Sequence, residues 1–268
     1  MEFMVFITAI NALRNNPEKL VYKIIMKFIK QALKTALREI GIRAYTEKSL
    51  TYNIDMGLDL VRMRRGRPLT TIFDVGANVG QTSRQMNRAF PDANIYAFEP
   101  FQASYDQLTV NTKEIDSIRR FKIALGDVPG KRRVAIEPGS VYNSIKQERS
   151  IHAGVEEEIS VERIDAFCQI RNIGKIDLLK TDTEGFDLEV LQGAGEMLSS
   201  GAVGAIFCEI AFDSRNRQNS HFQPIFNFLT EREFRFYGLY DTFFLHRNTS
   251  ETAFCDALFC HASFASTK

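Results

Sequence analysis

The stretch that decides the fold is Thr71-Ile72-Phe73-Asp74-Val75-Gly76-Ala77-Asn78-Val79-Gly80. Its first half is β-branched and aromatic around a single acid, which is typical of a buried parallel strand. Two glycines four residues apart follow, and Gln81 opens a helical segment. Glycine lets the backbone approach a ligand closely, and the free N–H groups of a helix start point beyond the strand. The stretch therefore predicts a ligand-binding corner in an α/β sheet.

The acid in this corner favours a cationic ligand over a pyrophosphate. A dinucleotide corner has the spacing G-x-G-x-x-G, whereas this one reads Asp74-x-Gly76-x-x-x-Gly80, and Asp74 would repel a pyrophosphate. A second strand ends in Glu99, 25 residues later, where a carboxylate accepts both hydroxyls of a ribose. S-adenosylmethionine (SAM) carries a ribose, an ammonium and a sulfonium. The residues expected to hold it are Asp74, Gly76, Asn78, Gly80, Glu99 and Pro100.

Four motifs in chain order together resemble the FkbM family of SAM-dependent methyltransferases. They are Asp74–Gly80, Tyr96–Pro100, Ala124–Asp127 and Leu179–Phe186. The resemblance implies an α/β, Rossmann-like class I methyltransferase fold with a mainly parallel seven-stranded sheet and helices on both faces. It also implies O-methylation of a hydroxyl on a sugar, glycolipid or other secondary metabolite, without naming the acceptor.

The resemblance gives a further cofactor residue, Asp127, just past the third strand. The class I fold usually uses this position to accept a hydrogen bond from the adenine amino group. The alternative is that Asp127 forms the turn in Gly126-Asp127-Val128-Pro129-Gly130, because Asp, Pro and Gly favour turns.

The candidate catalytic residues follow the fourth strand. Methyl transfer to an alcohol requires in-line positioning and removal of a proton. Alternate residues of an extended segment face the same way, so Lys180, Asp182 and Glu184 are predicted to share one pocket. Asp182 and Glu184 are hypotheses for the proton acceptor, and a carboxylate there could also bind a divalent cation that lowers the pKa of the alcohol. Glu184 capping the next helix is the alternative.

Other candidates are weaker. Glu209 ends an apolar fifth strand and is expected to line the substrate pocket. His152 and His221 are further candidate bases, although each fits an ordinary surface or helix-start histidine.

Composition indicates an ordinary globular protein. The chain has 268 residues, 44% hydrophobic and 25% charged, with a net charge of +1, which gives no argument for nucleic acid or membrane binding. The four cysteines form no CxxC pair, and a disulfide is not expected in a cytoplasmic enzyme. No apolar run approaches the ~20 residues that span a bilayer. The start of the chain lacks a clear cleavage site, so no signal peptide is expected.

Residues 1–66 are predicted to form a helical extension and residues 67–268 the methyltransferase domain. Within the extension, Pro17 to Arg43 has apolar residues at three- and four-residue steps, with its lysines largely on another face and Gly41 as a stop. Such a basic amphipathic helix suits weak contact with an anionic membrane surface or an acidic partner. A lid or a homodimer contact is the alternative.

From Thr71 the chain alternates strand and helix. Strands are expected to end at Asp74, Glu99, Leu125, Asp182 and Glu209. Helices are expected at 81–90, 102–112, from 186 and at 222–232. Residues 131–137 alternate at period two and should pair antiparallel with 159–162, with 139–144 as a loop over the cofactor. Segments 234–240 and 253–262 are expected to close the sheet.

Three other functions are alternatives to a small-molecule methyltransferase. Methylation of nitrogen is one alternative. Methylation of a nucleic-acid base is disfavoured, because an adenine methylase usually carries Asn/Asp-Pro-Pro-Tyr/Phe where this chain has Asp182-Thr183-Glu184-Gly185. The basic helix motivates a membrane- or partner-binding protein that retains SAM without turnover. An NAD oxidoreductase is disfavoured by Asp74 and the missing third glycine.

Overall fold

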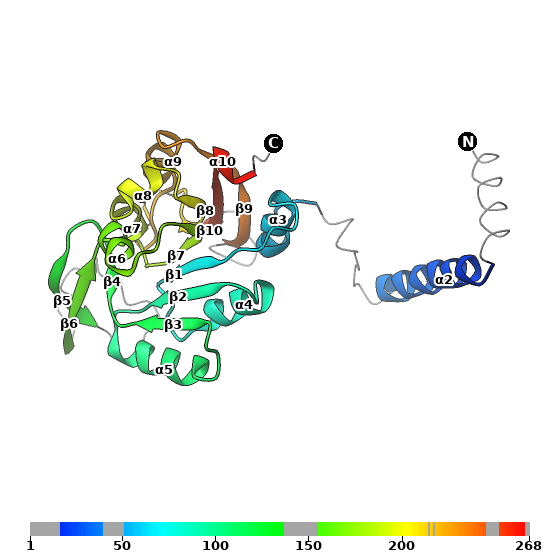
Figure 1. Cartoon of the computed structure of the whole chain (residues 1–268), viewed down its shortest axis with the longest axis horizontal. Helices are drawn as coiled ribbons and strands as arrows, with labels where there is room; N and C mark the ends of the chain where they lie inside the picture. The colour runs from blue at the N-terminus through cyan, green and yellow to red at the C-terminus, as the bar shows by residue number, and fades with distance from the viewer. Residues whose placement is uncertain are drawn as a thin grey trace. The chain divides into compact units, whose positions relative to one another are not determined.

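The computed structural model describes residues 17–39, 51–136, 155–213, 215–216, 218–244 and 252–265. The chain divides into two compact units, Met1–Thr51 and Tyr52–Lys268. The second unit therefore includes residues 52–66, which the sequence assigned to the N-terminal extension. The first unit contains helix α2 (Pro17–Glu39), drawn in blue in Figure 1. This helix confirms the amphipathic segment expected from Pro17, while its expected end at Gly41 lies outside the described residues.

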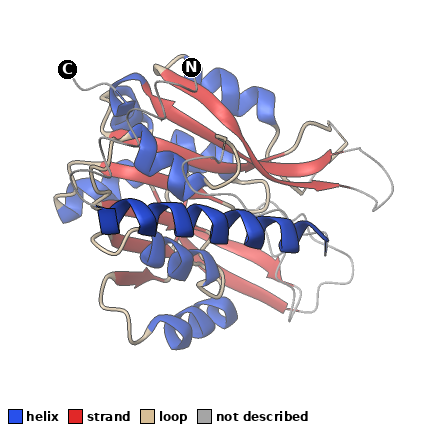
Figure 2. Cartoon of the chain, turned by 90° about the vertical axis from the view of Figure 1, so that its right-hand side faces the viewer, coloured by secondary structure: helices blue, strands red, loops and turns tan. Residues whose placement is uncertain are grey.

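The second unit is built on a seven-stranded sheet with the order β3-β2-β1-β7-β8-β10-β9. Strands β3, β2, β1, β7 and β8 are parallel, and β10 runs antiparallel to both β8 and β9. Figure 2 shows these strands in red with helices packed beside them. The strands are β1 (Thr71–Val75), β2 (Asn94–Phe98), β3 (Ile118–Phe121), β7 (Ile176–Thr181), β8 (Val203–Ile210), β9 (Phe234–Phe244) and β10 (Thr252–His261). The predicted mainly parallel sheet is confirmed.

Helices cover both faces because successive side chains of a buried strand point to opposite sides. Phe73 of β1 packs in one apolar cluster with helices α6 to α9, while its neighbour Ile72 packs in a second cluster with α3, α4, α5 and α10. The first set is α6 (Ile164–Arg171), α7 (Asp187–Gln192), α8 (Gly195–Ser199) and α9 (Phe222–Thr230). The second set is α3 (Met56–Met63), α4 (Gln81–Ala89), α5 (Gln102–Thr112) and α10 (Ala262–Ala265).

The third predicted strand, Arg120–Leu125, is two strands in different sheets, so that prediction was wrong in detail. β3 ends at Phe121 in the main sheet, and Lys122 and Ile123 carry the chain to β4 (Ala124–Leu125). β4 belongs to a three-stranded sheet of order β4-β6-β5, at the left-hand edge of the unit in Figure 1. β5 (Gly130–Ile136) pairs antiparallel with β6 (Val155–Glu162), which confirms the predicted insertion. The loop 139–144 lies outside the described residues.

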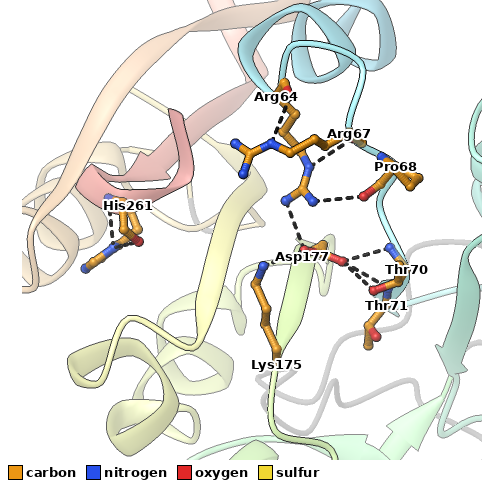
Figure 3. Close-up of polar contacts among 9 residues, drawn as sticks. Arg64, Arg67, Pro68, Thr70, Thr71, Lys175, Asp177 and His261 are labelled. Carbon is orange, nitrogen blue, oxygen red and sulfur yellow. Dashed lines mark hydrogen bonds and ion pairs between the residues drawn. The ribbon is translucent and has the colours of Figure 1, made fainter. Parts of the chain in front are cut away.

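A buried ion pair ties α3 to the sheet. Arg64, in the turn after α3, donates to Asp177 of β7 at 3.0 Å, and both side chains are buried. Thr70 and Thr71 also donate to Asp177, and Lys175 lies 3.0 Å from it (Figure 3). Burial acts to raise the pKa of Asp177, but these hydrogen bonds and cations outweigh it and hold that pKa below its ordinary value. The arginine cluster before Pro68 therefore includes an anchor inside the second unit.

Candidate active site

The loop after β1 presses against the end of β7, and only glycine fits there. Gly76 has φ +78°, and its N–H and that of Ala77 both donate to the carbonyl of Phe98 on β2. A Cβ on Gly76 would lie 1.8 Å from the carbonyl oxygen of Asp182. The backbone therefore reaches its position in the corner only because residue 76 has no side chain.

Glu99 at the end of β2 is held by backbone donors of the same corner. The N–H of Asn78 donates to one carboxylate oxygen of Glu99 and the N–H of Phe101 to the other, each at 3.0 Å. Burial raises the pKa of Glu99 to about 7, against these two hydrogen bonds, which act to lower it. Each oxygen still has a lone pair for a ligand hydroxyl.

Asp74 is enclosed rather than open to a ligand. Its side chain is fully buried and accepts a hydrogen bond from Ser83 of α4 at 2.5 Å. The ammonium of Lys180 lies 3.4 Å from Asp74 and donates to Asp182 at 3.2 Å. Burial acts to lower the pKa of Lys180, but the two carboxylates outweigh it, so the ammonium stays charged. Asp74 thus fixes the start of α4 and the position of Lys180.

The first of two clefts, here called the corner cleft, opens between the ends of β1, β2 and β7. Its empty space is about 680 Å³, including space open to solvent. Of the predicted residues, six line it: Gly76, Asn78, Glu99, Pro100, Asp182 and Glu184. The buried side-chain oxygen of Asn78 has no hydrogen-bond partner among the described residues, so a ligand donor would satisfy it. Gly80, with φ +88°, does not line the cleft and lies at the start of α4, where a Cβ would be 2.8 Å from Leu108.

The second, here called the aspartate cleft, is lined by the start of α3, helix α4, the end of β7 and residues of β8, β9 and β10. It is larger, about 1140 Å³ including space open to solvent. Its polar and aromatic lining includes Asp55, Lys180, Asp182, Phe207, Tyr240, Asp241 and Asp256. Among the lining residues described, only Asp182 is shared with the corner cleft. Its side chain is 39% exposed and therefore accessible.

Several carboxyl groups lie close together near Asp182, where the two clefts meet, and some of them hold protons near neutral pH. Burial, followed by the charge of Asp182, raises the pKa of Glu184 to about 7 and that of Asp256 to about 7. The same two causes raise the pKa of Glu209 to about 9. Glu209 faces Asp256 directly in the register of β8 and β10, which places both carboxyls on one side of the sheet. The cluster as a whole has too few cations to ionise fully.

The segment after β8 covers part of this cluster. Asn219 donates to Glu209, and Ser220 donates to the buried carboxyl of Asp187 at 2.9 Å. Burial and then Asp182 raise the pKa of Asp187. Glu209, predicted to line the substrate pocket, lines neither cleft described here. Sequence reasoning missed Asp187 and Asp256; Asp187 gave a signal as an acid just after the fourth-strand motif, and Asp256 gave none.

Other sequence candidates fall outside both clefts. Asp127 accepts from the N–H of Val128 at 2.8 Å, which fits the turn-forming alternative. His221 contacts the carbonyl of Asn216 at the start of α9, while His152 lies outside the described residues. Among the residues that the structure describes, no group of three or more His, Cys, Asp or Glu is arranged to hold a metal ion. All four cysteines are buried and free.

Comparison with known families agrees with this architecture. A family model described as the methyltransferase FkbM domain matches residues 74–236, more than half of the chain. The chain belongs to the FkbM methyltransferase family. The match spans the corner loop, the end of β7 and β8, and it ends at Phe236, before Tyr240, Asp241 and Asp256 of the aspartate cleft.

Relatives of this FkbM methyltransferase include a protein named as a 2-O-methyltransferase and one named as a hexuronic acid methyltransferase. It is 25% identical over 192 residues to the 2-O-methyltransferase NoeI of Sinorhizobium fredii, covering 65% of this chain and 77% of that one. It is 30% identical over 156 residues to the methyltransferase sdnD of Sordaria araneosa, covering 47% and 60%. It is 26% identical to the hexuronic acid methyltransferase AglP of Haloferax volcanii, covering 48% and 52%. The chain thus spans little more than half the length of the last two relatives.

Solved structures give only remote similarities. The precorrin-6Y C5,15-methyltransferase of Geobacter metallireducens matches with a TM-score of 0.43 and 10% identity, covering 82% of this chain and 94% of that one. The N-methyltransferase NodS of Bradyrhizobium japonicum matches with a TM-score of 0.42 and 10% identity, covering 76% and 93%.

Proposed function

We propose that this methyltransferase uses SAM to O-methylate a hydroxyl of a small molecule, with SAM in the corner cleft and the acceptor in the aspartate cleft. The observation that carries the proposal is the position of Asp182, which lines both clefts. A group that meets both ligands is where nucleophile and methyl group must be aligned.

The corner cleft offers groups suited to the donor. Glu99 would accept the ribose hydroxyls, and the oxygen of Asn78 and the backbone of Gly76 would contact the amino-acid end. Asp74 would act through the loop and Lys180 that it holds, because its carboxylate is enclosed. When bound, SAM supplies the methyl group of its sulfonium, and the thioether that remains is a good leaving group.

The carboxyl cluster would take the proton of the acceptor hydroxyl. Asp182 would accept its hydrogen bond, since it reaches both clefts. Glu184, which lines the corner cleft but not the aspartate cleft, would receive the proton by way of Asp182, because a carboxylate with a pKa of about 7 is a stronger base than an ordinary one. Glu184 sits at φ +51° next to Gly185 at φ +90°, a strained backbone that such sites tolerate. Lys180 would hold Asp182 in place.

The charge of the aspartate cleft favours neutral or cationic acceptors. Asp55, Asp182, Asp241 and Asp256 face it, with Lys180 as the only cation in the described lining. An acceptor that carries a carboxylate or phosphate would be repelled. A neutral hydroxyl-rich molecule such as a sugar fits this lining, and the name of NoeI, a 2-O-methyltransferase, supports a hydroxyl as the methyl acceptor.

To test the proposal, the enzyme is incubated with methyl-tritiated SAM and a small-molecule extract, and the tritium label is traced to the methylated products. The proposal expects label in neutral or cationic fractions, in products that survive alkali as methyl ethers do. Asp182→Asn should lose transfer by more than about a hundredfold while binding SAM nearly as well. Glu184→Gln should remove the rise in rate that the native enzyme shows as pH increases through about 7. Undiminished transfer by Asp182→Asn would overturn the assignment.

A further inference from the structure

Helix α2 carries a broad apolar face that the described residues of its own unit leave exposed. Seven of its large apolar side chains are between 46% and 73% exposed, and Phe28 is the most exposed. At about 100° per residue, the apolar residues of the helix occupy an arc of about 200° around its axis, with Ile24 at one edge and Met26 at the other. A face this wide and this exposed is far from the mixed polar surface of an ordinary solvated helix.

The remaining arc carries positive charge. Basic residues occur at positions 19, 23, 27, 30, 34 and 38 of the helical sequence, steps of three or four that place them within an arc of about 100°. Lys27, Lys30 and Arg38 are exposed. The helix has six basic residues against two acidic ones, Glu18 and Glu39. Lysines thus border a hydrophobic face along the whole length of the helix.

We infer that α2 lies flat on an anionic lipid surface, with its apolar face among the acyl chains and its lysines at the headgroups. Charge complementarity and a wide apolar arc are the two features that interfacial helices combine. The seam of a coiled-coil dimer is narrower than this face. Six basic residues within 23 positions also exclude a spanning helix, and no helix among the described residues is apolar enough to cross a membrane.

This inference is independent of the donor and the acceptor, so it can be tested on the full chain without either. The full chain is sedimented with vesicles of phosphatidylcholine alone and with vesicles that also contain phosphatidylglycerol. We expect binding to the anionic vesicles only, and a loss of binding as salt is raised. Lys27→Gln with Lys30→Gln should weaken it about fivefold for each lysine. Ile25→Ser with Phe28→Ser should remove it.

Matched controls lie on the second unit. Lys113→Gln with Arg88→Gln removes two exposed charges, and Ile170→Ser with Val110→Ser removes two exposed apolar side chains. These variants should bind anionic vesicles like the native chain. Light scattering is run in parallel to record the oligomeric state.

Three outcomes would overturn the inference. The first is no sedimentation with anionic vesicles. The second is binding that survives both sets of α2 variants. The third is an oligomer, present without lipid, that dissociates in the α2 variants while vesicles bind nothing, because the face would then belong to a second copy of the chain.

Discussion

The two ends of β7 carry aspartates in opposite electrical surroundings. At the first end, Asp177 is paired with Arg64 and Lys175 and accepts hydrogen bonds from Thr70 and Thr71. At the other end, Asp182 has Lys180 as its ion-pair partner, and Lys180 is shared with Asp74. The pKa of Asp177 is lowered, whereas carboxyls around Asp182 have raised values.

This difference in charge balance distinguishes a structural site, at Asp177, from a site suited to chemistry, at Asp182, at the two ends of one strand. A compensated aspartate gains stability from being ionised, as Asp177 does. A crowded cluster costs stability once it ionises, and such a cost persists where charge serves a reaction. The end of β7 that borders both clefts is the one with the unbalanced charge.

The largest effect is expected at the compensated end. Asp177→Ala leaves the buried guanidinium of Arg64 without its carboxylate, which should cost about 3–5 kcal/mol of the free energy of unfolding. Urea denaturation measures it. Asp116→Ala, at an exposed position, should change that free energy by less than about 0.5 kcal/mol. Equal costs for both variants would mean that the ion pair does not anchor the sheet.

A somewhat smaller effect is expected where the corner meets β7. Gly76→Ala places a Cβ 1.8 Å from the carbonyl oxygen of Asp182, so it should cost about 3 kcal/mol and abolish donor binding. Substitutions at two other glycines separate the effect of the clash from the effect of the positive φ. Gly66→Ala has the same strained φ without a clash and should cost about 1 kcal/mol, and Gly174→Ala has neither. Normal stability and donor binding in Gly76→Ala would show that the loop is not packed as described.

The smallest effect concerns the unbalanced cluster and depends on pH. Because the pKa of Glu209 is raised to about 9, the folded chain holds that proton where the unfolded chain has lost it, so stability falls as pH rises from about 4.5 to about 9. Glu209→Gln mimics the protonated form and should gain about 1–3 kcal/mol at pH 9 and little at pH 5. Thermal unfolding at both pH values checks this. A gain that is the same at both would mean that ionisation is not its cause.

The corner was predictable because its residues are contiguous and their roles are local. Asp74 lies in β1, Gly76 and Glu99 directly follow β1 and β2, and the strand order places those two strands side by side. The burial of Asp74 was not predictable, because it depends on Ser83 and on Lys180 from a distant strand.

The aspartate cleft could not be predicted for a similar reason. Asp256 reaches it because β10 pairs antiparallel with β8, and Tyr240 because β9 pairs with β10. Asp55 reaches the cleft from the start of α3, a helix that the sequence pattern did not predict. No spacing in the sequence encodes these contacts. The break at Lys122 was likewise invisible, since it depends on a second sheet competing for β4.

The most direct test of the two-cleft account is a calorimetric titration of SAM into the native chain, Glu99→Gln and Asp256→Asn. Glu99 lines the corner cleft and Asp256 the aspartate cleft. The account predicts that Glu99→Gln weakens SAM binding by at least about tenfold, since a buried amide replaces an acceptor of ribose hydroxyls, and that Asp256→Asn leaves it unchanged. Loss of SAM binding in Asp256→Asn, with full affinity in Glu99→Gln, would contradict it.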